Sequence, residues 1–293
     1  MAFSKAFVAI VGACNNAKQD ECTWFVINDQ KVGLLTPKVR QLLLCDSDVF
    51  EPFEGGMKLN PLLNTFDKRS AAVANVINRW RKEEIFPFFS NWRNEDLNIW
   101  GRFDEKPLLK MERVALSVFG AKQYGAHING YVKSEDGNIK GIWVATRALT
   151  KSTSPGKYDQ LSAGAMSVGD DIVGCARREV HEEAGISHDI SEKMKPVGTV
   201  SYFYKDERGL FPEVQFIYDL ELQEDYIPRN IDGEVSEFTL MSIEQVKRVL
   251  INDEFKFNSA LVMLDFFIRH AVIAPDEETY YVFLAEHMLS LIH

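Results

Sequence analysis

Hydrophobic residues recur at helical spacing in several segments of the chain. In residues 70–84 (SAAVANVINRWRKEE), Val73, Val76, Ile77 and Trp80 fall on one face, which predicts an amphipathic helix against a core. The same spacing predicts further helices over residues 1–14, 37–44, 243–250, 259–271 and 275–290. Ser242 is placed to cap the helix over 243–250, and an acidic run, Asp276-Glu277-Glu278, opens the last one.

Alternation of hydrophobic and polar residues predicts strands elsewhere. Residues 24–35 predict a hairpin around Asn28-Asp29, and a second hairpin joins 197–204 to 214–222 across the sequence KDERG. Other strands are expected over 97–103, 126–132, 142–146, 161–163 and 237–241, whereas 49–63 is expected to be irregular. We therefore predict an α+β chain, with a small α+β domain over residues 1–110 and a second domain over 111–293.

The segment Gly164–Ile186 (GAMSVGDDIVGCARREVHEEAGI) predicts a helix with a crowded acidic face. Glu179, Glu182 and Glu183 lie three and four residues apart and project from one side. An apolar stripe can pack inward, formed by Ile172, Val173, Ala176, Val180 and Ala184, and Gly185 suits a left-handed cap. Clustered carboxylates repel one another unless a cation binds among them, and oxygen ligands suit Mg²⁺ or Mn²⁺. Without further evidence, such a run is more often a solvated helix face.

This segment resembles a Nudix box, a 23-residue pattern. The matching positions are Gly164, Arg178, Glu179, Val180, Glu182, Glu183, Gly185 and Ile186. At the seventh position the family has Glu and this chain has Asp170; the resemblance implies that this acid braces the loop against the arginine. It also implies a Nudix α/β/α sandwich, in the order strand–strand–helix–hairpin–strand–helix, behind the N-terminal domain.

The rest of the chain resembles the thiamine pyrophosphokinase-related Nudix subfamily, which carries an extra N-terminal domain of the DUF4743 type. The matching segments are Lys31–Gly33, Trp92–Glu95, Tyr124–Val132, Thr150-Lys151, Pro155-Gly156, Tyr218–Leu222, Asp232–Val235 with Phe238, and Phe257-Asn258. Gln160 and Ala165 differ from the subfamily's Asp-Asn-Leu and Ala-Gly-Gly motifs, which bears on substrate preference. The resemblance implies hydrolysis of damaged (oxo- and oxy-) thiamine diphosphates to the monophosphate and phosphate.

The resemblance also implies roles in the box. Glu182 and Glu183, with the carbonyl of Gly164, would ligate Mg²⁺ or Mn²⁺, Glu179 would be a further ligand or the general base, and Arg178 would orient the glutamates. A base from a later loop is the alternative. Glu234 is preferred over Glu237 because it lies in an Asp-Gly-Glu turn, although a plain polar turn explains it equally well.

Candidate substrate contacts lie outside the box: Arg93, Asn94, His127, Asn129, Tyr131 and Lys151. Arg93 is the preferred contribution of the N-terminal domain, because a guanidinium binds phosphate in a bidentate manner. His127 and Asn129 share one strand face, but a satisfied core histidine and a solvated lysine are the commoner explanations for His127 and Lys151. Trp92 or Tyr202 could stack on a heterocycle, although aromatic residues in such positions more often belong to a core.

Charge and cysteine content narrow the setting. The net charge of −10 argues against nucleic-acid or anionic-membrane binding, so bound metal and local Lys or Arg must offset this charge at an anionic substrate. The four cysteines are scattered, which favours a reducing, cytoplasmic protein over a disulfide scaffold. No hydrophobic run is long enough to span a bilayer. A monomer and a homodimer both remain open.

Three functions are compatible with the sequence. The first is a Mg²⁺-dependent hydrolase of a thiamine-diphosphate-like compound. The second is a nucleotide-type Nudix hydrolase that acts on ADP-ribose or a nucleoside diphosphate derivative. The third is a ligand-sensing module without turnover, which ranks last because all three box glutamates are present.

Overall fold

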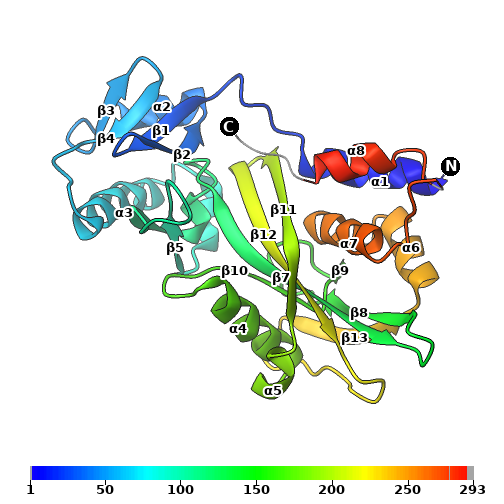
Figure 1. Ribbon diagram of the computed structural model, residues 1–293. Coiled ribbons are helices and arrows are strands. Elements are labelled where there is room, and N and C mark those ends of the chain that lie inside the picture. Colours follow the sequence, from blue (N-terminus) through cyan, green and yellow to red (C-terminus); the bar gives the residue numbers. More distant parts are fainter. Residues whose placement is uncertain (1, 277, 289–293) are drawn as a thin grey trace.

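The computed structural model describes residues 2–276 and 278–288, and its N-terminal part is built on a four-stranded sheet ordered β2-β1-β4-β3 (Figure 1). Strands β1 (Thr23–Ile27) and β2 (Gln30–Leu35) form the predicted hairpin. Its turn residues Asn28 and Asp29 have φ of 48° and 62°, the conformation that tight hairpins with the twist of the sheet require.

The expectation of irregular structure over residues 49–63 is wrong. This segment forms β3 (Phe50–Phe53) and β4 (Gly56–Leu59), which pair with each other, and β4 also pairs in parallel with β1. Each strand has only four residues, and Pro52 lies in the edge strand, so the local pattern is weak. The pairing with β1 is a tertiary contact that the local sequence does not reveal.

Helices and short segments complete this part of the molecule. The predicted helices appear as α2 (Pro37–Leu43) and α3 (Phe66–Lys82), which is capped by Thr65, and Val73, Val76, Ile77 and Trp80 are all buried. The 3₁₀ helix η1 (Pro87–Asn91) leads into a two-stranded sheet of β5 (Asp96–Ile99) and β6 (Leu109–Glu112). A second 3₁₀ helix, η2 (Arg113–Ala115), follows. One hydrophobic core joins these elements and continues to Ala121.

The second sheet has seven strands, with β11-β12-β7-β8-β13 in order and β10 and β9 attached to β7 and β8. Its bounds are β7 (Gln123–Lys133), β8 (Ile139–Arg147), β9 (Tyr158–Asp159), β10 (Ser162–Ala165), β11 (Lys195–Asp206), β12 (Gly209–Glu221) and β13 (Val235–Met241). The predicted hairpin β11–β12 is confirmed. Strands β7 and β12 pair in parallel, and the other pairs are antiparallel.

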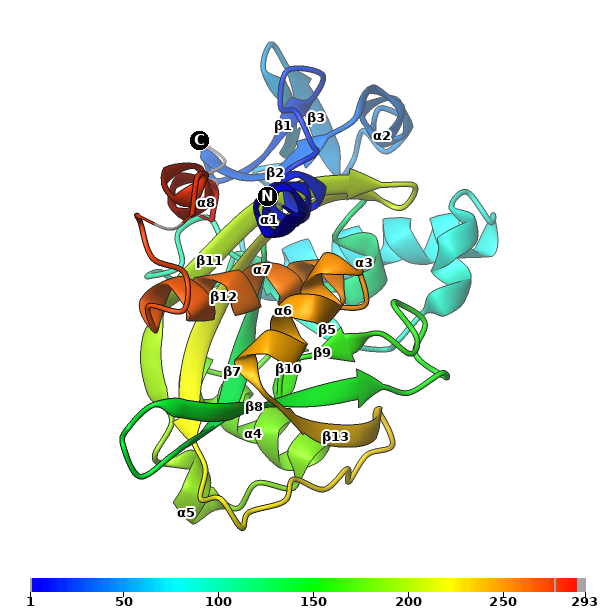
Figure 2. The same ribbon diagram turned by 90° about the vertical axis from the view of Figure 1, so that its right-hand side faces the viewer.

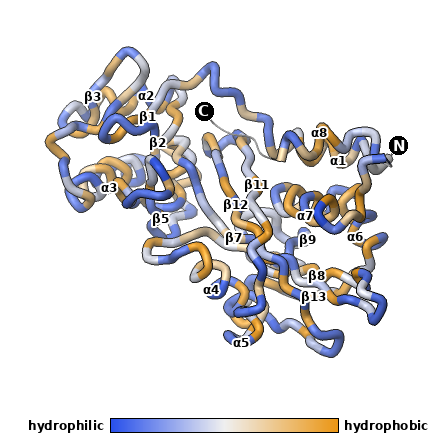
Figure 3. Tube along the Cα trace, in the orientation of Figure 1, coloured by the Kyte–Doolittle hydropathy of each residue, from blue (hydrophilic) through white to orange (hydrophobic). Residues whose placement is uncertain are grey.

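Helices cover both faces of this sheet. On one face α4 (Ile172–Ala184) packs on β7 and β10, followed by the short α5 (His188–Ser191). On the other lie α6 (Ile243–Ile251), which has a complete capping box at Ser242, and α7 (Phe257–Arg269) (Figure 2). Figure 3 shows hydrophobic residues along α7, which is buried along most of its length. The sheet with helices on two faces is the expected α/β/α sandwich.

The two ends of the chain meet on this outer layer. Helix α1 (Ala2–Cys14) packs on α6, α7, α8 and β11, and its Phe7, Val11 and Cys14 belong to the C-terminal core. The division after residue 110 stays a prediction; α1 lies with the later domain, and β6 extends past residue 110.

The last helix is shorter than predicted. Helix α8 (Tyr281–His287) begins six residues after Pro275, so Asp276 and Glu278 do not occupy its first turn, while Glu277 and Ser290 lie outside the described residues. Glu278 instead accepts hydrogen bonds from the Ser4 hydroxyl (3.1 Å) and the Tyr280 N–H (3.0 Å). These bonds hold the segment against α1 in a non-helical conformation.

The mixed α+β class is confirmed, with the four-stranded sheet preceding the sandwich. Within residues 2–276 and 278–288, no helix is both long and apolar enough to cross a bilayer.

Candidate active site

Helix α4 supplies the acidic face, and local sequence defines both of its ends. The Asp171 carboxylate accepts the Gly174 N–H (2.6 Å) at the start, and Gly185 ends the helix with φ of 64°. Ala176, Val180 and Ala184 are buried as predicted, but Val173 is 42% exposed. The buried face is turned toward Cys175, whose thiol contacts the carbonyl of Ala165 (3.4 Å), so Val173 falls at its edge.

Arg178 is the hub of the polar contacts on this helix. Its guanidinium donates to Asp170 (2.7 Å), Glu179 (2.7 Å), Glu182 (3.3 Å) and the carbonyl of Ala165 (3.2 Å). The Asp170 carboxylate also accepts the Ser167 N–H (3.1 Å). The aspartate therefore reaches the arginine despite its shorter side chain, and it closes the loop that precedes α4.

Two of the three glutamates are largely buried. The Glu183 carboxylate accepts the Ala163 N–H (2.9 Å), and burial, with the nearby charges of Glu179 and Asp159, raises its pKa to about 8. Burial also raises the pKa of Glu179, against the effect of Arg178. The protein groups around Glu179 and Glu183 therefore do not fully compensate the negative charge of these carboxylates.

These residues fit a hard divalent cation. The donors are carboxylate and backbone carbonyl oxygens, and Gly164 lies so close to Glu179 that a Cβ on it would be 1.8 Å from Glu179 Cδ. Among the described residues, no three carboxylate, imidazole or thiol groups already converge as metal ligands. One nitrogen of Arg178 donates to both Glu179 and Glu182, whereas the Ala163 N–H binds Glu183, so a cation would have to compete with these donors for the carboxylates.

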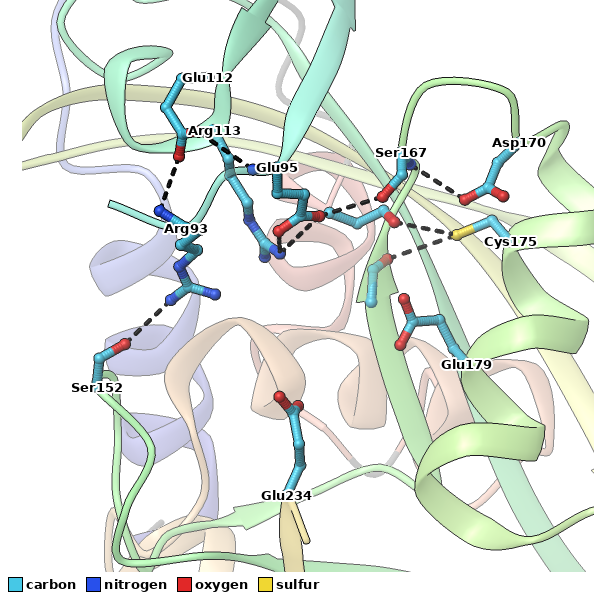
Figure 4. A network of polar contacts seen from close by, with 12 residues as sticks. Arg93, Glu95, Glu112, Arg113, Ser152, Ser167, Asp170, Cys175, Glu179 and Glu234 are labelled. Atoms are coloured by element: carbon cyan, nitrogen blue, oxygen red, sulfur yellow. Dashed lines mark hydrogen bonds and ion pairs between the residues drawn. The ribbon is translucent and has the colours of Figure 1, made fainter. Parts of the chain in front are cut away.

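A cavity of about 330 Å³, here called the acidic cavity, lies over this face. It brings together the predicted residues Arg93, Lys151, Gly164, Arg178, Glu179, Glu182, Glu183 and Glu234. Figure 4 shows Arg93, Arg113 and Glu95 on one side of an open space, with Glu179 and Glu234 pointing into it from two others. Glu234 is paired with Lys151; burial would raise its pKa, but Lys151 more than offsets this and lowers it.

The acidic cavity also contains residues that the sequence analysis missed, chiefly Glu95, Arg113 and Lys256. Glu95 pairs with Arg113 (2.9 Å) and accepts the Ser167 hydroxyl (3.2 Å), so it links the N-terminal part to the loop before α4. Glu95 lies within a segment that carries the family resemblance. Arg113 begins η2 and Lys256 immediately precedes α7, and no sequence signal distinguishes either of them as a site residue.

Four predicted substrate contacts lie away from the acidic cavity. Asn94 lines a separate groove with Arg81 and Trp92, because its positive φ of 57° turns it away from its neighbours Arg93 and Glu95. Asn129 is fully buried and donates to Asp219 (3.1 Å).

Tyr131 and His127 lie on the face of β7 that α7 covers. Tyr131 packs on Phe266 and is 5% exposed. His127 is buried and hydrogen-bonded to Gln160 (2.9 Å), and burial, followed by Lys256, lowers its pKa to about 4. It lines a small cavity beside Gly164, as a neutral residue.

From the sequence, Tyr202 and Trp92 are also candidates for rings that stack on a heterocycle, and Glu237 is the less preferred candidate for the general base. Tyr202 is a core residue that donates to Glu213 (2.7 Å). Trp92 packs on Phe89, and the Arg81 guanidinium lies over its ring. Neither Tyr202 nor Trp92 lines the acidic cavity. Glu237 is exposed on β13 and is absent from the cavity lining, whereas Glu234 is part of it.

Comparison with known proteins agrees with this architecture. The model of the NUDIX domain matches residues 124–261, and the model named domain of unknown function (DUF4743) matches residues 6–123. Nudix hydrolase 20, chloroplastic, of Arabidopsis thaliana is 37% identical over 94% of this chain and 75% of its own length. Nudix hydrolase 24, chloroplastic, of the same plant is 37% identical with the same coverage.

An uncharacterized Saccharomyces cerevisiae protein, YJR142W, is 34% identical over 82% of this chain and 73% of its own length. Among solved structures, the Deinococcus radiodurans protein DR0079 aligns with a TM-score of 0.45 at 17% identity, over 58% of this chain and 98% of that one. The sequence relationships extend across both parts of the molecule, and the chain belongs to the Nudix hydrolase family.

Proposed function

We propose that this protein is a Mg²⁺- or Mn²⁺-dependent hydrolase that cleaves an organic diphosphate, most specifically a thiamine-diphosphate-like compound, to the monophosphate and phosphate. The observation that carries the proposal is the acidic cavity. It joins three glutamates of α4 to cationic side chains on the facing wall, in a chain of the Nudix hydrolase family.

The α4 side of the cavity is the proposed metal side. Glu182, Glu183 and the carbonyl of Gly164 would hold the cation, with Glu179 as a further ligand, and Arg178 orients the carboxylates. Bound there, a divalent cation supplies charge neutralisation of the phosphate oxygens and lowers the pKa of a water molecule.

The facing wall supplies groups for the phosphates and for proton transfer. Arg93 and Lys151 were expected there, and Arg113 and Lys256 join them. Water attacks the terminal phosphorus, and the bond from that phosphorus to the bridging oxygen breaks. The electron pair of that bond stays on the bridging oxygen of the monophosphate.

Glu234 is the preferred base for the proton of the attacking water. It lies across the open space from Glu179 (Figure 4), and its pairing with Lys151 lowers its pKa, so it is ionised at neutral pH. Glu179 is the alternative, because it is both a potential ligand and the nearer carboxylate to Gly164.

The thiamine-like substrate is supported by the resemblance of the flanking segments to that Nudix subfamily. A nucleotide-type substrate such as ADP-ribose is the alternative. A sensing module without turnover is disfavoured because Glu179, Glu182 and Glu183 all line one cavity with cations opposite. The scattered cysteines are all free, which supports the cytoplasmic, reducing setting that we propose.

The test is Mg²⁺-dependent phosphate release from oxothiamine and oxythiamine diphosphates, with ADP-ribose in parallel. Glu183→Gln should lower kcat at least about 100-fold, because it removes a carboxylate from the proposed metal side. Glu237→Gln, an exposed glutamate outside the cavity, is the matched control and should keep normal activity. Equal rates for the wild-type and Glu183→Gln proteins would overturn the proposal.

A further inference from the structure

A second cavity of about 520 Å³ adjoins the acidic cavity, and both parts of the chain line it. Phe88 and Asn91 come from η1 in the N-terminal part, and the opposite walls come from the β11–β12 hairpin and the start of α7. Arg93, Arg113, Thr153 and Lys256 line both cavities. The two cavities therefore meet at these four residues.

The junction between the two cavities is cationic. Arg93 donates to the Ser152 hydroxyl (3.0 Å) and, within residues 2–276 and 278–288, makes no ion pair with a carboxylate. Burial and the neighbouring charge of Arg113 lower the pKa of Arg93. Lys256 lies 3.5 Å from Asp159 and immediately precedes α7, whose first turn contains no acidic residue. A phosphate bound here would relieve the repulsion between these cations.

Beyond the junction, aromatic side chains line the cavity together with Arg208, whose guanidinium lies over the Phe211 ring. Tyr204 stacks on Phe211, with ring centroids 4.6 Å apart and an angle of 6°, and the edge of Phe257 contacts Tyr204 (4.9 Å). Phe88 lines the same cavity from the other part of the chain and is only partly buried. Aromatic walls favour a planar ligand, and in this cavity they come from both parts of the chain.

Glu213 supplies an acceptor within this cavity. One carboxylate oxygen accepts the Tyr202 hydroxyl (2.7 Å) and the Gln215 amide (2.8 Å). The other oxygen has no hydrogen-bond partner among the described residues, and Glu213 lines both the second cavity and the small cavity beside Gly164. Glu213 is half-buried, so this oxygen is open to the cavity and can accept a hydrogen bond from a ligand there.

We propose that the second cavity binds the organic group of the substrate, and that this group is a flat aromatic heterocycle bearing an N–H donor that Glu213 accepts. The inference rests on the proposed function, since it places the diphosphate at the junction. It assigns specificity to Glu213 of the β11–β12 hairpin and Phe88 of the N-terminal part. Aminopyrimidine and adenine rings share this chemistry.

Binding of reaction products to the metal-free protein tests the inference without turnover. The probes for isothermal titration calorimetry are thiamine monophosphate, AMP and inorganic phosphate, which lacks a ring. Glu213→Gln keeps the shape of the side chain, but its carbonyl must face Tyr202 and Gln215, so its NH₂ faces the ring. We expect it to weaken binding of the preferred ring-bearing probe about tenfold or more.

Phe88→Ala should weaken binding of the same probe about fivefold, because the contact between the Phe88 ring and the probe is lost. Neither variant should change the Kd for inorganic phosphate by more than about twofold, given the errors expected for such weak binding. Glu237→Gln and Phe53→Ala, exposed residues outside this cavity, are the matched controls, and thermal unfolding confirms that all four variants fold. Preference for thiamine monophosphate or for AMP identifies the source of the ring, and either preference supports the inference.

Two results would overturn the inference. One is that neither ring-bearing probe binds more tightly than inorganic phosphate. The other is that Glu213→Gln and Phe88→Ala leave the Kd of the ring-bearing probes unchanged, or weaken the binding of inorganic phosphate as much as that of the ring-bearing probes. Failure of the wild-type protein to hydrolyse any diphosphate would refute the proposed function instead, and these titrations would still report on the cavity.

Discussion

Replacing Arg178 by lysine tests whether this residue organises the acidic face. The guanidinium reaches three carboxylates and one carbonyl at once, at 2.7 to 3.3 Å. A lysine ammonium is a single point donor on a flexible chain, so Arg178→Lys cannot hold Asp170 on one side and Glu179 on the other in the same geometry. The positive charge stays, and the orientation of the carboxylates is lost.

The structure sets the size of the effect. Hydrogen bonds to charged groups contribute about 1.5–3 kcal/mol each when buried, but the Arg178 side chain is 32% exposed, so screening lowers this toward about 1 kcal/mol. Losing one or two of these bonds should cost about 1–2 kcal/mol of the free energy of unfolding. The effect on catalysis should be larger, about 10–100-fold in kcat, as for other groups that orient metal ligands.

The assay compares kcat, KM and the Mn²⁺ concentration for half-maximal activity in both proteins, with urea unfolding alongside. Arg177→Lys is the matched control, because Arg177 lies on the same helix and makes no ion pair with the described residues. The reasoning fails if Arg178→Lys keeps activity and metal dependence within about twofold of the control, since orienting groups normally show larger effects.

Three further predictions follow from single contacts. Gly164→Ala places a Cβ 1.8 Å from Glu179 Cδ, and because the flexible carboxylate can move, activity should fall at least about tenfold with little change in the unfolding midpoint; normal activity would contradict this. Gly185→Ala should cost about 1 kcal/mol in urea unfolding, because φ is 64° and the Cβ would meet the Arg229 carbonyl at 2.9 Å, and an unchanged midpoint would refute it. Burial alone would raise the pKa of Asp159, but Lys256 and Arg147 hold it well below its usual range, so its stabilising effect is present above about pH 4 and is lost below it. Asp159→Asn should therefore cost about 3–5 kcal/mol at pH 7, and the gap to the wild type should narrow as the pH falls below about 4; a gap independent of pH would contradict the assignment.

The acidic helix is an example of what local sequence can specify. The spacing of Glu179, Glu182 and Glu183, with Asp171 at one end and Gly185 at the other, determines the helix and its carboxylate face without reference to the rest of the chain. The hairpins at Asn28-Asp29 and across KDERG were likewise predictable, because the turn residues and the alternating strands agree. Side-chain period and cap chemistry are local properties, so one sequence suffices for them.

The facing wall could not be predicted in the same way. Arg93 and Lys151 were identified, yet Asn94, Asn129 and Tyr131 lie elsewhere, and Arg113 and Lys256 were missed. Arg113 follows β6 and Lys256 precedes α7, so only the packing of the N-terminal part on the sandwich brings these distant charges to one place. Strands β3 and β4 were missed because each has only four residues and because β1, with which β4 pairs, is distant in the sequence.

By itself, the sequence determined the α+β class, most helices and hairpins, and an acidic helix that matches the Nudix pattern. The tertiary structure decided which cationic side chains face that helix and which polar residues are instead buried in the core. It also decided that a second cavity, between the two parts of the chain, adjoins the acidic cavity. The physical reason is that periodicity and capping act within a few residues, whereas this cavity depends on surfaces from η1, η2, the loop after β8, the β11–β12 hairpin and α7 meeting in space.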